Sequence, residues 1–415
     1  GPDRFDAPAA APLRQLDQHT WCLELWHGPT SAFKDMALQM LPQLLSTSLR
    51  MTGEEKTACI LVATSGDTGK AAMEGFADVE QTKILVFYPR DGVSEIQKLQ
   101  MVTQEGDNVG VCAVEGNFDD AQNGVKRIFS DPAIREELEK RGCFLSSANS
   151  INWGRILPQV VYYISAYCDL LNAKEIKLGD KVNYSVPTGN FGNLLACYYA
   201  RRMGLPVGKL ICASNCNDVL TEFLRTGVYD RNRPFHTTMS PSMDILISSN
   251  LERLLFDLSG GDDGLIRSLM EQLRERGRYE IPEEMRAKLG ELFYGGFCGE
   301  EDTASTVAQL YRCGYLIDTH TAVAAKVLTD YRRETGDMTP AVFLSTASPY
   351  KFCDSVLSAI GETPVSDSVE RIAQLEAATG VAAPARLTAL KGKAPRFHQV
   401  TKREAMEDVV LDFLK

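Results

Sequence analysis

The sequence has no long uninterrupted apolar run and no strongly basic segment. One apolar run, Ile156–Leu171, is interrupted by Pro158, Gln159 and Asp169 and is too short to span a bilayer. The net charge is −11, so nucleic acids and anionic membranes are poor candidate partners. No signal peptide precedes the first polar segment, and we expect a cytoplasmic protein that binds a small molecule.

Paired-cysteine and metal-binding motifs are also missing. The 11 cysteines are scattered through predicted strands and helices without a Cys-x-x-Cys pair, which favours buried free thiols over a disulfide framework. His27, His236 and His320 are not spaced as metal ligands, and no His-Glu-x-x-His motif occurs. No metal site is predicted. The length of 415 residues is sufficient for a large core and for two or more domains.

The segment around Lys34 is the most informative part of the chain. Gly28-Pro29 breaks the preceding structure, and Thr30 or Ser31 is a suitable N-cap for a helix that reaches about Leu45. Apolar residues recur there at helical spacing: Phe33, Met36, Ala37, Met40, Leu41 and Leu44. Lys34 therefore lies in the first turn, where its ammonium opposes the helix dipole. Such a lysine is closer to a neutral amine that can form a Schiff base, although an exposed surface lysine is the alternative.

Strands and helices alternate through the rest of the sequence. Apolar strands are predicted from Thr57–Ala63 to Phe144–Ser147, and a second series begins at Val182–Val186. This pattern indicates an α/β protein with two doubly wound lobes of parallel strands. A helix is predicted over Ile245–Leu258 and a loop over Gly295–Gly299. We divide the chain into an N-terminal segment with the lysine helix (1–56, part of the larger lobe), a smaller lobe (57–150), a larger lobe (151–360) and peripheral C-terminal helices (361–415).

Polar turns follow several predicted strands at their carboxyl ends, where ligands gather in open α/β sheets. Thr64–Lys70 can cradle an anion at a helix start, but it is not a Walker A loop because position 64 is threonine. Pro187–Asn193 contains two glycines that let the main chain approach a ligand closely. Ser345–Pro349 is a third such turn, and Asn149–Arg155 either caps a long helix or holds an anion. Each of these turns, taken alone, can also be an ordinary connection.

Taken together, these segments resemble threonine synthase of the bacterial and fungal branch, a fold-type II pyridoxal-phosphate (PLP) enzyme of tryptophan-synthase-β-like architecture. The matching segments follow the family's order between Trp21 and about Ile360: His27–Asp35, Thr64–Gly69, Asn149–Arg155, Pro187–Asn193 and Ser345–Phe352. Position 348 is serine where many members have histidine. The resemblance implies two α/β lobes with PLP in the cleft between them.

The resemblance also implies roles for single residues. Lys34 would carry the cofactor, Thr346 would face its pyridine nitrogen, and Asp67 would lie near its phenolic oxygen, where other branches have asparagine. A hydroxyl opposite the pyridine nitrogen makes the ring a weaker electron sink than a carboxylate would. The cofactor phosphate would bind to one turn: Thr188, Gly189, Asn190, Phe191, Gly192 and Asn193. The substrate would contact a second set: Ser65, Thr68, Lys70, Asn149, Asn152 and Arg155.

The implied reaction converts O-phospho-L-homoserine and water into L-threonine and phosphate by γ-elimination and β-replacement. Arg155 can offer a bidentate fork to the substrate phosphate, and Lys70 a point charge at a helix start. A related PLP-dependent phospholyase or dehydratase is one alternative. Another is a catalytically idle form without the N-terminal region that the family normally has before its lysine motif. We expect a monomer or a weak homo-oligomer.

Overall fold

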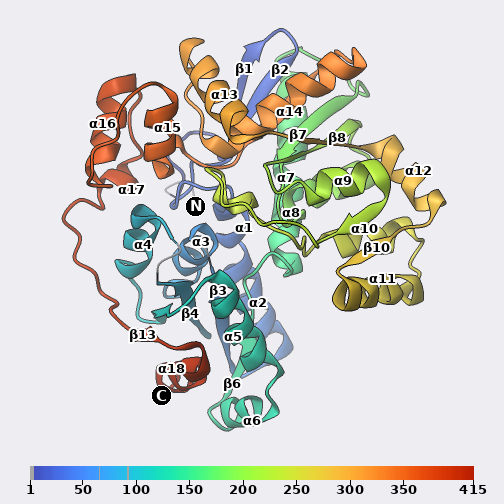
Figure 1. Cartoon of the computed structure of the whole chain (residues 1–415). Coiled ribbons are helices and arrows are strands. Elements are labelled where there is room, and N and C mark those ends of the chain that lie inside the picture. The colour runs from blue at the N-terminus through green and yellow to red at the C-terminus, as the bar shows by residue number, and fades with distance from the viewer. Residues whose placement is uncertain (1–3, 65, 91–92) are drawn as a thin grey trace.

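The chain folds around two separate β-sheets, as Figure 1 shows for the computed structural model, which describes residues 4–64, 66–90 and 93–415. The larger sheet has the strand order β1-β2-β12-β7-β8-β11. Its first two strands are antiparallel, and all its other pairings are parallel. The strands are β1 (Leu13–Asp17), β2 (Thr20–Glu24), β7 (Val182–Pro187), β8 (Val207–Ser214), β11 (Phe293–Phe297) and β12 (Ala341–Ser345).

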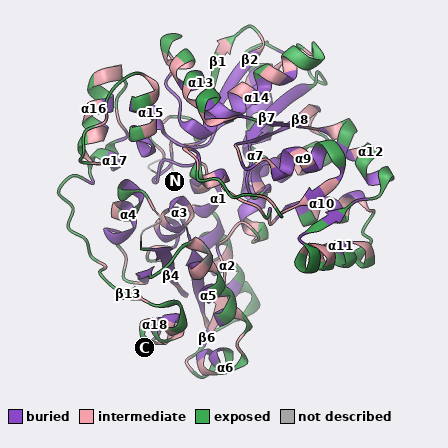
Figure 2. Cartoon of the chain, viewed as in Figure 1, coloured by how far each residue is buried: buried purple, intermediate pink, exposed green. Residues whose placement is uncertain are grey.

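The smaller sheet is wholly parallel and has the order β13-β5-β4-β3-β6. Its strands are β3 (Thr57–Ala63), β4 (Thr82–Pro89), β5 (Val109–Val114), β6 (Cys143–Ser146) and β13 (Val400–Thr401). Ile60 packs with Phe76 on one face, whereas Leu61 packs with Ile128 on the other. Both faces are therefore buried under helices, and Figure 2 shows the central strands β3, β4 and β5 as mostly buried. This arrangement confirms the predicted α/β class with doubly wound parallel sheets.

Helices cover both sheets, and within the described residues none is long and apolar enough to cross a membrane. A short antiparallel pair, β9 (Val228–Asp230) and β10 (Arg278–Glu280), lies apart from the two sheets. The helices are α1 (Lys34–Leu38), α2 (Leu41–Thr52), α3 (Asp67–Phe76), α4 (Glu95–Val102), α5 (Phe118–Ser130), α6 (Pro132–Lys140), α7 (Trp153–Asn172), α8 (Gly192–Arg202), α9 (Val219–Thr226), η2 (Pro241–Met243), α10 (Leu251–Leu258), α11 (Asp263–Arg276), α12 (Glu283–Leu292), α13 (Glu300–Arg312), α14 (Thr319–Thr335), η3 (Pro349–Lys351), α15 (Cys353–Ala359), α16 (Glu370–Thr379), α17 (Ala385–Thr388), η4 (Arg403–Ala405) and α18 (Met406–Phe413).

Two local predictions were wrong. The expected loop over Gly295–Gly299 largely forms β11, because the main chain there pairs in parallel register with β8 although glycine has little preference for strands. The helix expected from Ile245 begins only at Leu251. The residues just before Leu251 instead lie against the turn that follows β7, because the Ser248 hydroxyl donates to the Gly189 carbonyl at 2.9 Å.

Helix α1 lies where the two sheets meet. It contacts α3, which covers the smaller sheet, and α7, which packs in the core of the larger sheet. The carboxyl-terminal part of the chain also joins the two regions, because α15 packs against α13, whose neighbour α14 covers the larger sheet, while β13 adds an edge strand to the smaller one (Figure 1). Sheet membership alone does not fix domain limits, so the four-part division of the chain stays a prediction.

Candidate active site

The lysine segment departs from its predicted form at both ends. Helix α1 begins at Lys34, and its N-cap residue, Phe33, makes no side-chain cap. The predicted cap at Thr30 or Ser31 is wrong, because the Thr30 hydroxyl donates instead to Asp35 Oδ1 at 2.7 Å. The predicted continuous helix is also broken after Leu38, and α2 starts at Leu41 with a proline in its first turn, where its missing N–H costs nothing.

The apolar stripe predicted along that helix is correspondingly incomplete. Ala37 is fully buried and Leu41 is 6% exposed, whereas Met40 is 47% exposed and Leu44 is 37% exposed. The segment forms two separate helices, so a single helical period does not describe both.

Main-chain hydrogen bonds dock the lysine segment onto the end of β12. The Phe33 N–H donates to the Thr346 carbonyl at 2.8 Å, and Ala32 forms a bridge with Ala347. Thr346 is 6% exposed. The turn after β12 and the residue ahead of Lys34 therefore lie side by side, although they are far apart in the sequence.

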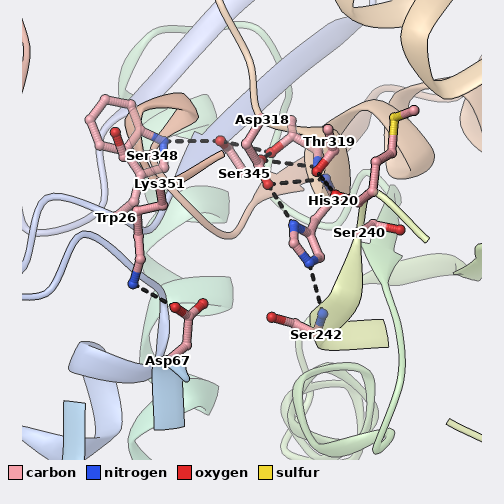
Figure 3. Close-up of polar contacts among 12 residues, drawn as sticks. Trp26, Asp67, Ser240, Ser242, Asp318, Thr319, His320, Ser345, Ser348 and Lys351 are labelled. Carbon is pink, nitrogen blue, oxygen red and sulfur yellow. Dashed lines mark hydrogen bonds and ion pairs between the residues drawn. The ribbon is translucent and has the colours of Figure 1, made fainter. Parts of the chain in front are cut away.

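Three charged side chains act on Lys34, namely those of Asp67, Arg155 and Lys351, and we call these four residues together the charged cluster. Lys351 Nζ lies 2.6 Å from Asp67 Oδ1, and Lys34 Nζ lies 3.6 Å from Asp67 Oδ2. Figure 3 shows Lys351 extending from its turn to Asp67. Gln97 completes the contacts of the carboxylate by donating to Oδ1 at 2.8 Å. One carboxylate oxygen thus has two donors, while the other faces Lys34.

Burial and charge set the protonation of these groups. Burial, with the like charges of Lys351 and Arg155, lowers the pKa of Lys34 to about 8, although Asp67 acts in the opposite direction. Burial alone would raise the pKa of Asp67, but the ammonium groups of Lys351 and Lys34 outweigh it and hold that pKa well below its usual range. Lys34 therefore yields a neutral amine close to physiological pH while Asp67 stays ionised.

Arg155 is buried without a carboxylate. Its side chain is on the first turn of α7, it is 3% exposed, and Nη1 donates to the Ala148 carbonyl at 2.8 Å. Its Nε has no acceptor, and across the described ranges no acidic side chain forms an ion pair with it. Burial lowers the pKa of the guanidinium to about 10, so it remains charged at neutral pH. A buried cation without a counter-ion is a site for an anionic ligand.

The turn between β7 and α8 offers main-chain donors instead of charged side chains. Phe191 adopts a left-handed conformation (φ 60°) ahead of Gly192, and α8 begins without a side-chain cap. The main-chain N–H groups of residues 190–193 have no hydrogen-bond acceptor in the described part of the chain. The next N–H group that is bonded to the turn is that of Leu195, which donates to the Phe191 carbonyl. Unpaired N–H groups at the start of a helix form a binding site for a phosphate.

Neighbouring side chains hold this turn in place. Tyr162 and Tyr163 both donate to Asn193 Oδ1, at 2.5 and 2.6 Å, whereas the buried Nδ2 of Asn193 has no acceptor. The Thr188 hydroxyl donates to the Val186 carbonyl at 2.7 Å. Asn190 is exposed, and its carbonyl accepts from the Asn250 side chain at 3.0 Å. The turn is thus rigid on its protein side.

The remaining predicted substrate contacts are placed less favourably. Lys70 Nζ donates to Glu74 at 3.0 Å and to Gln104, so its charge already has a carboxylate partner. Thr68 is partly buried on the first turn of α3. Ser65 lies outside the described residues.

The residues that lead into α7 have different roles, because one caps the helix and others have polar atoms without a partner. Asn152 is the N-cap of α7, with its Oδ1 accepting from the Gly154 N–H at 2.9 Å. Asn149 Oδ1 is buried and has no donor. The capping interpretation therefore fits Asn152, while Asn149 and Arg155 keep free polar atoms.

Two residues of this region were not among the predicted site residues. Lys351 lies within the Ser345–Phe352 segment, but only the fold shows that its side chain reaches Asp67. His320 Nε2 accepts from the Ser242 N–H at 3.1 Å, so its Nδ1 carries the proton and donates to Asp318 Oδ2 at 2.7 Å, as Figure 3 shows. The bond from Ser242 to His320 fixes η2, which lies close to Gly189. A Cβ added to Gly189 would lie 3.1 Å from the Ser242 carbonyl oxygen.

Comparison with family models and known proteins agrees with this geometry. Residues 6–347 match the model described as pyridoxal-phosphate dependent enzyme, and residues 321–410 match that of the threonine synthase C-terminal region. Threonine synthase of Pseudomonas aeruginosa is 43% identical over 362 residues, covering 87% of this chain and 74% of the relative. Human threonine synthase-like 1 is 42% identical, covering 86% of this chain but 48% of the relative. The chain thus spans about half the length of the threonine synthase-like 1 proteins that it matches.

Solved structures give the same result. The PLP-bound threonine synthase from Brucella melitensis has a TM-score of 0.86 at 39% identity, covering 100% of this chain and 82% of its own. Yeast threonine synthase also has a TM-score of 0.86, at 33% identity and with 99% and 82% covered. The chain therefore belongs to the threonine synthase family of pyridoxal-phosphate-dependent enzymes.

Proposed function

We propose that this chain is a PLP-dependent threonine synthase that converts O-phospho-L-homoserine and water into L-threonine and phosphate. The observation that carries the proposal is the buried guanidinium of Arg155, which has no carboxylate partner among the described residues and lies close enough to Lys34 to lower its pKa. An amino acid with a phosphate group would bring the missing negative charge to the place where its amine meets Lys34.

The residues present fit PLP at two points. Lys34 is a buried lysine whose pKa is lowered to about 8, which suits attachment to an aldehyde. The unpaired N–H groups of residues 190–193 and the free Nδ2 of Asn193 suit the cofactor phosphate. Thr346 and Asp67 remain the proposed neighbours of the ring nitrogen and of the phenolic oxygen. Bound PLP would supply an electron sink for the negative charge that develops as protons leave the substrate.

Lys34 is the proposed proton carrier. The reaction removes protons from Cα and Cβ, breaks the Cγ–O bond to phosphate, forms a Cβ–OH bond from water and returns hydrogen to Cγ and Cα. A single amine that is close to neutral at physiological pH can both accept and return a proton. Asp67 would keep the ammonium form of Lys34 in position through its Oδ2.

Arg155 is proposed to hold the substrate phosphate before and during its departure. The fork of a guanidinium matches phosphate oxygens, and its fixed position in the first turn of α7 avoids reorganisation when the leaving group gains charge. Lys70 was predicted to share this task, but its pairing with Glu74 makes it the weaker candidate, and Arg155 is sufficient for the proposal.

The decisive experiment is product analysis with purified protein, PLP and O-phospho-L-homoserine. Equal amounts of L-threonine and phosphate are the expected products. Phosphate with a 2-oxo acid and ammonia would instead establish the phospholyase or dehydratase alternative. Cofactor attachment without any turnover would establish a catalytically idle family member. The proposed setting remains a cytoplasmic monomer or weak homo-oligomer acting on a small molecule.

A further inference from the structure

The contacts of Lys351 are unusual for a lysine. Its side chain is buried, and Nζ has only two oxygen partners in the described chain: Asp67 Oδ1 at 2.6 Å and the Thr30 carbonyl at 3.0 Å. Both partners belong to segments that border Lys34. Lysine is rarely buried in this way unless its charge has a specific counterpart, so Lys351 is tied to the state of Asp67.

The carboxylate of Asp67 is oriented by unequal contacts to its two oxygens. Lys351 and Gln97 both donate to Oδ1, whereas Oδ2 faces Lys34 at 3.6 Å. The longer separation leaves Oδ2 available to a donor that approaches beside Lys34. Lys351 therefore fixes which oxygen of Asp67 is presented to the reacting amine.

We propose that Lys351 is a positioning residue that keeps Asp67 ionised and turned toward Lys34, and that its positive charge favours the neutral form of the Lys34 amine. This inference rests on the proposed function only in taking Lys34 as the cofactor lysine.

Several charged groups act on this pair, and each affects the expected pH response. Lys34 is faced by Asp67 from α3, by Arg155 from α7 and by Lys351 from η3. Lys351 is also near Asp35, whose pKa is raised by burial to about 6 despite two hydrogen bonds from Thr30. Asp67 attracts the ammonium form of Lys34, whereas Lys351 and Arg155 repel it. Removal of Lys351 weakens the repulsion, so the pKa of Lys34 should rise.

The test measures the reactivity of the Lys34 amine in the cofactor-free chain, by competitive labelling with an amine reagent across pH and peptide mass mapping. Lys351→Met should raise the midpoint of Lys34 labelling by about one pH unit and slow labelling at pH 7 about tenfold. Lys351→Arg should retain the original midpoint. Lys326→Met is a matched control, because Lys326 forms a similar pair with Asp330 at 2.5 Å on α14.

A second pair of variants keeps the test decisive if Lys351→Met does not fold. Asp67→Asn should lower the midpoint because it removes an attractive carboxylate, and adding Lys351→Met should raise it again. An unchanged midpoint on loss of Lys351 in both backgrounds, or an equal change in Lys326→Met, would overturn the proposal. Labelling requires neither substrate nor turnover, so a failure to form threonine would refute the proposed reaction and leave this result intact.

Discussion

Two neighbouring regions of this protein are suited to anions by different means. The turn over residues 188–193 is neutral and presents main-chain N–H groups at the start of α8. The charged cluster instead brings together side chains from α1, α3, α7 and η3. A phosphate that stays bound needs only fixed dipoles, whereas a phosphate that leaves during the reaction benefits from full charges.

The two regions also differ in how many parts of the chain form them. The turn is formed by one continuous stretch, and its neighbours mainly hold it rigid. The cluster depends on four separate segments, and Asp67, Arg155 and Lys351 all act on Lys34, so a change in any of these three alters the protonation of Lys34. Variants in the turn should therefore change cofactor affinity alone, while variants in the cluster should change chemistry, pH response or both.

The largest expected effect comes from Lys34→Ala. Removal of the amine should abolish covalent attachment of PLP and lower turnover by about a thousandfold or more, because the proposed proton carrier is lost as well. Borohydride reduction followed by peptide mass mapping should place the pyridoxyl group on Lys34 in the unaltered chain. A label found on another lysine would contradict the assignment.

Arg155→Ala should come next. The loss of a charge-assisted bond worth roughly 1.5–3 kcal/mol should lower kcat/KM for O-phospho-L-homoserine about tenfold to a hundredfold. Cofactor attachment, measured by its visible absorbance, should persist because Lys34 and the turn over residues 188–193 are unchanged. Arg202→Ala is the control, since that arginine is partly exposed and pairs with Asp257. Loss of PLP in Arg155→Ala, or phosphate release that is unaffected by the change, would contradict the assignment of Arg155 to the substrate phosphate.

The pH dependence of cofactor uptake should distinguish the regions further. With the pKa of Lys34 lowered to about 8, the neutral amine becomes scarcer as pH falls, so the uptake rate should drop about tenfold per pH unit below 8 and level off above it. Stopped-flow absorbance over pH 6–9 measures this. A midpoint near that of an ordinary lysine would show that burial and the neighbouring cations do not act as inferred.

The smallest effect is expected from Gly189→Ala in the turn. The added Cβ would lie 3.1 Å from the Ser242 carbonyl oxygen and 3.2 Å from Met243 Cα, so the main chain of η2 must move slightly. Cofactor affinity should fall about fivefold, equivalent to ~1 kcal/mol, with no change in the pH midpoint. Gly290→Ala is the matched control, because nothing lies within 4 Å of its added Cβ. A shifted midpoint would show that the two regions are not separable.

Local sequence signals were sufficient for the alternating strands and helices and for the polar turns after the strands. Strand β3 occupies its predicted range and β7 begins at its predicted residue, because an apolar strand pattern depends on neighbouring residues. The same signals placed Lys34 in a first helical turn, although the helix proved shorter and its predicted cap was wrong. The family's motifs then identified the turn over 188–193 and Arg155 as candidates for binding.

Only the tertiary structure decided which charges act on one another. Lys351 and Asp67 are distant in sequence. No periodicity predicts that both side chains are buried or that Lys351 Nζ lies 2.6 Å from Asp67 Oδ1. The same holds for Arg155, whose lack of a carboxylate partner among the described residues is a property of its surroundings. Strand β11 likewise exists because β8 supplies its hydrogen-bond partners. Burial and long-range pairing depend on the whole fold, so the sequence determines the elements and turns, while their packing determines the charges of the site.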